Sequence, residues 1–443
     1  MRGAAGTRRR GIRRTARSSS GGSGGSYRSS CGSDGPAPRS GARSCSARTK
    51  LAPQVRSLGR GLALSLILLG QSLARAGRSG ARAASTMSTR TSLPAAIKTI
   101  GTLQPNPTPF PTQDPFLFCV YHRDFMPAGN ANMEAPRRGN GHDFDASKPY
   151  RMYHGDRIPG FPQHPHRGFE TITATMAGLI DHTDSVGNGG RYGEGDLQWM
   201  TAGKGIVHGE MFPLVHDDKP NTLQLFQIWL NLPSRSKMVE PDFVMHWADQ
   251  VVTVPDLDKA KVTVWAGAWG DLVPPRPPVA SWAADPENEV TVWLLELQPG
   301  GSVSLPTARG GDAISRSLYL VEGEGAAIVT DEGTTPLLKQ QYAVLRGAGT
   351  EMQVAHLDEG ASESVKVLVL GGKPIGEPVT QYGPFVMNTQ REIQQAFHDY
   401  QTTRFGGWPW DEDAYVFPKD RTRFALVDGV ETFPGTCEGQ EES

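Results

Sequence analysis

Short apolar segments separated by turn-forming residues run through this chain from about residue 95. The 443-residue sequence contains 52 glycines and 34 prolines, which punctuate segments such as 116–121, 222–230, 262–265 and 290–295. Such segments have the length of strands rather than of average helices. Many short strands with frequent turns are typical of antiparallel sandwiches and barrels. The sequence therefore predicts an all-β fold.

A weak internal repeat divides this β-rich body into two halves. The segment 173–178 resembles 317–323, and the segment 192–208 resembles the residues from 341 onward. The body is also longer than one small barrel requires. We therefore expect two tandem β-barrels, with one short helix near the C-terminus over 389–398 that Asn388 caps.

The expected domain organisation has four parts. They are a disordered Arg/Ser-rich leader at 1–90, an N-terminal barrel at 95–250, a C-terminal barrel at 251–375, and a helix with an acidic tail at 376–443.

Two short segments each place a pair of metal-capable side chains two residues apart. These pairs are His164 with His166, and His208 with Glu210. Residues i and i+2 of a strand point to the same face, so each pair can direct both side chains to one point. Three imidazoles and one carboxylate form a plausible site for a divalent first-row metal.

The two halves are chemically unequal. If Gly178 is aligned with Gly323, the positions of His164 and His166 fall near Arg309 and Gly311. Near the positions of His208 and Glu210, the second half offers only His356. We therefore expect one metal per chain, in the first barrel.

Glu170 is a competing carboxylate ligand. On a straight strand it would lie about 13 Å beyond His166, and it could reach the metal only through a bend near Gly168. Glu210 needs no such bend, so we expect Glu210 to be the ligand and Glu170 a neighbour outside the ligand set. His122 is expected to be packed or on the surface, and His154 and His182 to lie on the surface or at the rim of a pocket.

The sequence resembles the pirin family of the cupin superfamily. The resemblance spans about residues 100–410 and rests on three motifs: HPHRGFET at 164–171, GDLQWMTAG at 195–203 and GPFVMN at 383–388. It implies a bicupin, with two jelly-roll-like barrels and metal only in the first. It also implies that His164, His166, His208 and Glu210 are the ligands, with Fe(2+) as the usual metal, although Ni, Cu, Mn or Zn can occupy such ligands.

The resemblance implies a quercetin 2,3-dioxygenase, an oxidoreductase that opens a flavonol ring with O2. Its substrate would be a small aromatic molecule that needs an apolar pocket with few polar anchors. Glu210 would act as the catalytic base that takes the substrate's proton. The alternative is a non-catalytic, iron- or redox-responsive regulator that binds a transcription factor or a metabolic enzyme.

The charge is distributed unevenly along the chain. Residues 1–90 hold 18 of the 45 Lys+Arg but only one acidic residue, Asp34. The acidic remainder disfavours nucleic acid as a partner of the body. The biased leader, with an apolar run at 62–69 too short to span a membrane, is typical of a transit peptide for a plastid or mitochondrion. An Arg-rich arm that binds nucleic acid, or translation from Met87 of a cytoplasmic protein, are the alternatives.

Overall fold

The computed structural model describes residues 93–136 and 143–435. The leader predicted for residues 1–90 lies outside these ranges. Within them, no helix has both the length and the apolar character that crossing a bilayer requires. Strands are the predominant secondary structure of the described residues, which confirms the predicted all-β fold.

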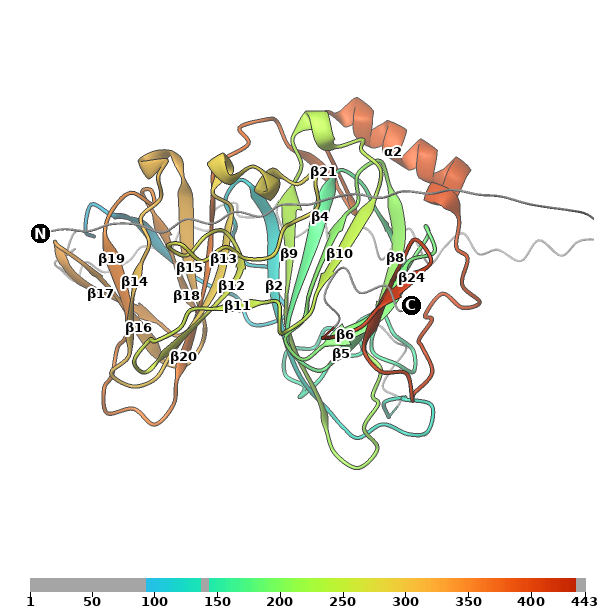
Figure 1. The fold of residues 1–443 in the computed structure, drawn as a ribbon, viewed down its shortest axis with the longest axis horizontal. Helices are drawn as coiled ribbons and strands as arrows, with labels where there is room; N and C mark the ends of the chain where they lie inside the picture. Colours follow the sequence, from blue (N-terminus) through green and yellow to red (C-terminus); the bar gives the residue numbers. More distant parts are fainter. Residues whose placement is uncertain (1–92, 137–142, 436–443) are drawn as a thin grey trace, which may run out of the picture. The chain divides into compact units, whose positions relative to one another are not determined.

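The first barrel consists of two antiparallel sheets (Figure 1). One has the strand order β10-β7-β4-β9-β2 and the other β24-β23-β6-β5-β8-β3. The bounds of these strands are β2 (Phe116–Met126), β3 (Gly160–His166), β4 (Phe169–Ala177), β5 (Leu179–Asp184), β6 (Gly189–Gly193), β7 (Leu197–Thr201), β8 (Ile206–Met211), β9 (Asn221–Asn231), β10 (Asp242–His246), β23 (Phe424–Val427) and β24 (Val430–Thr432).

The second barrel also has two sheets, in the orders β1-β18-β15-β20-β13-β12-β11 and β14-β19-β16-β17. Apolar side chains such as Val264, Leu295 and Leu318 form its buried core. The bounds of its strands are β1 (Ile97–Thr102), β11 (Val252–Thr253), β12 (Ala260–Ala266), β13 (Thr291–Leu297), β14 (Ser302–Leu305), β15 (Ser315–Glu322), β16 (Gly325–Thr330), β17 (Gly333–Leu338), β18 (Gln341–Leu345), β19 (Met352–His356) and β20 (Val365–Gly372).

Strand pairing crosses the predicted domain ranges at both ends of the chain. Strand β1, which we expected in the first barrel, pairs with β18 of the second because Ile97 joins the apolar core there. Strand β23, from the segment expected to be a tail, pairs with β6 of the first barrel. Its residues Phe424 and Ala425 are buried, so this part of the tail supplies core rather than only charge.

The predicted C-terminal helix is α2 (Gln390–Thr403), which follows the hairpin of β21 (Thr380–Tyr382) and β22 (Phe385–Met387). Its N-cap is Thr389, in a capping box with Glu392, so the prediction of Asn388 as the cap was wrong by one residue. The Asn388 amide instead donates to Glu377. Short 3-10 turns complete the described elements: η1 (Ser234–Ser236), η2 (Trp282–Ala284), η3 (Pro286–Asn288), η4 (Gly311–Ala313) and η5 (Arg404–Gly406).

A second apolar cluster joins the outer faces of the two barrels. Ile172 and Trp199 of the first barrel share it with Trp265 and Leu368 of the second. Glu170 lies on the same face of β4 as Ile172, since the two are two residues apart. Its carboxylate accepts hydrogen bonds from Thr201 Oγ1 at 2.7 Å and from Ser281 Oγ at 2.6 Å. Complete burial raises the pKa of Glu170 to about 7.

A buried ion pair attaches the C-terminal segment to the first barrel. Arg191 of β6 donates from Nε and Nη2 to the Asp181 carboxylate of β5, at 2.7 and 2.8 Å. The same guanidinium donates to the backbone oxygens of Phe417, Pro418 and Arg421. This clamp fixes the residues that lead into β23.

Replacing Arg191 with methionine should destabilise the protein by about 3–5 kcal/mol, because the change leaves Asp181 buried without its cation. Urea unfolding would measure the loss, and limited proteolysis should cut the C-terminal segment first. The matched control is Arg309→Met, since Arg309 forms an exposed pair with Glu287 at 3.6 Å. The control should lose at most about 1 kcal/mol. Equal losses in the two variants would contradict the role of the clamp.

The stability of the protein should depend on pH through Glu170. The folded protein holds this proton up to about pH 7, whereas the ordinary pKa is 4.5. The contribution of protonated Glu170 to the free energy of unfolding is therefore complete below pH 4.5, and it is lost as pH rises through 7. Between these values, the free energy of unfolding of the wild type should fall by on the order of 3 kcal/mol relative to Glu170→Gln.

Urea unfolding at a series of pH values, followed by tryptophan fluorescence, would measure this difference. The control is Glu240→Gln, because the Glu240 side chain is exposed and should leave the wild-type pH dependence intact. Parallel curves for the wild type and Glu170→Gln would show that Glu170 ionises normally.

Candidate metal centre

The two predicted ligand pairs lie on adjacent strands of one sheet. Strand β3 pairs with β8 in antiparallel register, which places His164 directly opposite His208. A register shift between Phe161 and His164 accommodates Pro162, so that Phe161 lies opposite Glu210. The alternation of the two strands therefore directs the predicted pairs into the same barrel interior.

The three histidines form a compact cluster. The ring centroid of His208 is 4.4 Å from that of His164 and 4.8 Å from that of His166. One nitrogen of each ring lies within 4.8 Å of the others. His166 and His208 are buried, and His164 is half-buried. The structure thus brings together the three histidines that the spacing indicated.

The ring nitrogens of the three histidines have the properties of metal ligands. His164 Nδ1 donates to the Pro162 backbone oxygen at 2.9 Å, which leaves the Nε2 lone pair available. Neither ring nitrogen of His208 has a hydrogen-bond partner among the described residues, although both are buried. Burial lowers the pKa of His164 to about 4 and those of His166 and His208 well below 6.5. Neutral, desolvated imidazoles of this kind fit a divalent first-row metal.

Glu210 lies beside this cluster rather than within its tightest group. Its Oε2 is 3.8 Å from His208 Nε2. Thr173 Oγ1 and Gln227 Nε2 donate to its carboxylate at 3.4 Å. Burial raises the pKa of Glu210, while His182, Gln227 and Thr173 oppose that rise. Glu210 is therefore the one predicted ligand that the structure places beside the histidine cluster and not within it.

The turn after His166 is held firmly in place. Gly168 has a φ of +85°, and a Cβ there would lie 2.0 Å from the Val386 backbone oxygen, so only glycine fits. The buried Lys237 ammonium donates to the backbone oxygens of Gly168 and Val386, at 2.8 and 3.1 Å, and to Asn231 Oδ1 at 2.7 Å. The β22 segment is thereby fixed against the turn that follows the first ligand pair.

Aromatic rings extend from the cluster toward the surface. The Phe161 ring lies 6.3 Å from His164 and 6.5 Å from Phe144, which is 42% exposed. The half-buried His154 contacts both phenylalanines. His122 is packed, as expected, against Tyr153, with Nδ1 2.6 Å from the hydroxyl. These rings form an aromatic edge beside the histidine cluster.

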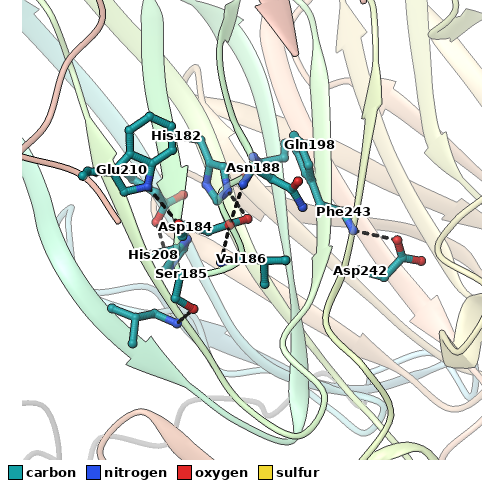
Figure 2. Close-up of polar contacts among 12 residues, drawn as sticks. His182, Asp184, Ser185, Val186, Asn188, Gln198, His208, Glu210, Asp242 and Phe243 are labelled. Carbon is teal, nitrogen blue, oxygen red and sulfur yellow. Dashed lines mark hydrogen bonds and ion pairs between the residues drawn. The ribbon is translucent and has the colours of Figure 1, made fainter. Parts of the chain in front are cut away.

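His182 is a residue whose burial beside the histidine cluster the sequence prediction missed. We expected it on the surface or at a rim, but it is completely buried, with its ring 5.5 Å from that of His208. Strand β5 pairs with β8 so that His182 lies opposite Glu210 and Asp184 opposite His208 (Figure 2). The signal was present in the sequence, because His182 and Asp184 form a third pair two residues apart.

The structure corrects the expected position of Glu170. Its neighbours are Thr201 and Ser281 at the junction of the two barrels, and none of the three histidines is bonded to it. The physical reason is the turn at Gly168, which begins a new strand and resets the alternation of faces. Phe169, not Glu170, contacts His166, at 5.0 Å between ring centroids. Glu170 therefore stabilises the junction between the barrels rather than the ligand cluster.

Known proteins resemble this chain in both sequence and fold. A family model described as Pirin matches residues 129–230, and one described as Pirin C-terminal cupin domain matches 292–406. A pirin-like protein of Solanum lycopersicum is 39% identical over 250 residues, which cover 56% of this chain and 77% of that protein. Pirin-1 of Arabidopsis thaliana is 38% identical over 248 residues, which cover 56% and 78%.

The crystal structure of a quercetin 2,3-dioxygenase from Acinetobacter baumannii has a TM-score of 0.52 and 29% sequence identity to this chain. The match covers 66% of this chain and 87% of that one. The tandem barrels are thus of the cupin type. Together, the two family models and these relatives show that the chain belongs to the pirin family.

Proposed function

We propose that this pirin-family protein binds one divalent metal through His164, His166, His208 and Glu210 and opens the ring of quercetin-like flavonols with O2. The observation that carries the proposal is the buried cluster of three imidazoles, in which both nitrogens of His208 lack a partner among the described residues. The likeness to a quercetin 2,3-dioxygenase supports the choice of reaction. Iron is the metal that we expect in the native protein.

The aromatic edge of the site supports a flavonol as the substrate. Phe161 lies beside the half-buried His164, and the partly exposed Phe144 lies beyond it, so we expect a planar phenolic molecule to approach along these rings with one hydroxyl toward the cluster. The bound metal would polarise that hydroxyl as a Lewis acid. A dioxygenase places both atoms of O2 in its products, so the reaction needs no external reductant.

Glu210 is the residue that we expect to take the hydroxyl proton. It lies next to His208, with its Oε2 3.8 Å from His208 Nε2, so a carboxylate stands beside the histidine cluster. Thr173 and Gln227 donate only long hydrogen bonds to it, at 3.4 Å, so the carboxylate can move. Removal of the proton makes the flavonol electron-rich and therefore reactive toward O2.

The test combines metal analysis with oxygen uptake on one preparation. Wild-type protein loaded with Fe(2+) should hold about one metal per chain and consume O2 in the presence of flavonols. His208→Ala should lose both properties. The control is His356→Ala, since His356 is a buried histidine of β19 that accepts a hydrogen bond from Asp358 N. This control should retain both properties.

The outcomes separate the two candidate functions. No oxygen uptake by the metal-loaded wild type with any flavonol of a panel would overturn the dioxygenase. Metal binding without uptake would favour the alternative, a metal-dependent regulator. That alternative has its own support in the second barrel, whose apolar core keeps the fold without an equivalent cluster among the described residues.

A further inference from the structure

A third pair of polar side chains lies on β5, the strand next to β8, beside the candidate ligands. His182 and Asp184 occupy β5 two residues apart, and both are completely buried. The register with β8 places His182 opposite Glu210 and Asp184 opposite His208. Directly opposed side chains of an antiparallel pair are neighbours on one face of the sheet. The β5 pair therefore faces the same interior as the ligand pair of β8.

Asp184 is anchored by the protein backbone. Its Oδ1 accepts hydrogen bonds from the amides of Val186 and Asn188, at 2.9 and 3.0 Å. The Asp184 backbone oxygen accepts a further hydrogen bond from Trp410 Nε1 at 2.8 Å. The remaining carboxylate oxygen, Oδ2, lies 3.4 Å from His182 Nε2. One side of the imidazole thus faces a fixed carboxylate, as Figure 2 shows.

The ring of His182 is also fixed by packing. It stacks on Phe243 of β10, with 5.2 Å between ring centroids and 28° between ring planes. Its Nδ1 is buried without a hydrogen-bond partner among the described residues. A buried polar atom without a partner destabilises the folded protein unless a ligand or a movement supplies one.

Glu210 is the carboxylate that can supply this partner. Its hydrogen bonds from Thr173 and Gln227 are long, at 3.4 Å, so the carboxylate is loosely held. It lies opposite His182 across the strand pair. An imidazole that carries a proton on both ring nitrogens can donate from both, so such a ring can join Asp184 on one side to Glu210 on the other.

Resting on the metal site proposed above, we propose that His182, anchored by Asp184, is the positioning residue that orients Glu210 for metal binding. In this role His182 would hold one carboxylate oxygen of Glu210 and leave the other for the metal. Partners that orient a ligand in this way typically contribute 10–100-fold to metal affinity.

The test is the dissociation constant for Ni(2+), measured by competition with a chromogenic chelator. His182→Phe keeps an aromatic ring against Phe243 and should weaken binding about 10–100-fold. Asp184→Asn should weaken binding in the same direction but by less, and His182→Gln, which keeps a donor, should recover part of the loss. The control is His356→Phe, which alters a buried histidine in the second barrel and should leave the affinity unchanged.

A double-mutant cycle distinguishes positioning from general damage to the barrel. If His182 acts through Glu210, then His182→Phe should have no further effect on Ni(2+) affinity in a Glu210→Ala background. The same loss in both backgrounds would overturn the inference. So would a wild-type affinity for folded His182→Phe. If His182→Phe does not fold, the nearly isosteric Asp184→Asn carries the same cycle.

Failure of this inference is distinguishable from failure of the proposed function. His164→Ala should lose Ni(2+) binding whether or not His182 positions Glu210. Retention of metal by His164→Ala would show that the ligand set itself is wrong. Loss of metal by His164→Ala together with unchanged affinity in His182→Phe would reject only the positioning role.

Discussion

The candidate site depends on the antiparallel pairing of β3 with β8. This pairing places His164 opposite His208, and the two-residue period of each strand keeps His166 and Glu210 on the same side. A slip of one residue would turn these side chains to the outer face of the sheet. The hydrogen bonds of Lys237 and the close contact at Gly168 fix the end of β3, so the register has support from outside the pair.

The two barrels share an architecture but enclose different chemistry. Apolar side chains such as Val264 and Leu295 form the core of the second barrel, and they leave little place for a polar ligand. The first barrel buries Thr173 and Gln198 in addition to the ligand pairs. Burial of polar groups without partners is costly, which supports the proposal that the first barrel binds a metal. This contrast is the reason why we propose a metal site in the first barrel and only a structural role for the second.

The sequence allowed part of the site to be predicted and left another part hidden. The spacing of the two ligand pairs was sufficient for His164, His166 and His208, because strand alternation is a local property. The same spacing relates His182 to Asp184, yet its significance depends on β5 lying beside β8. Glu170 was expected outside the ligand set but near it, whereas the new strand that begins after Gly168 directs it to Thr201 and Ser281 at the junction of the barrels.

The sequence by itself determined the class of fold, the division into two halves and the confinement of the metal-capable pairs to the first half. Tertiary structure alone decided which strands became neighbours. Strand β1 joined the second barrel, and β23 paired with β6 although their residues lie more than 200 positions apart. Local periodicity fixes which face of a strand is apolar. The partner of that face is chosen by the burial that the whole chain achieves, which no local pattern records.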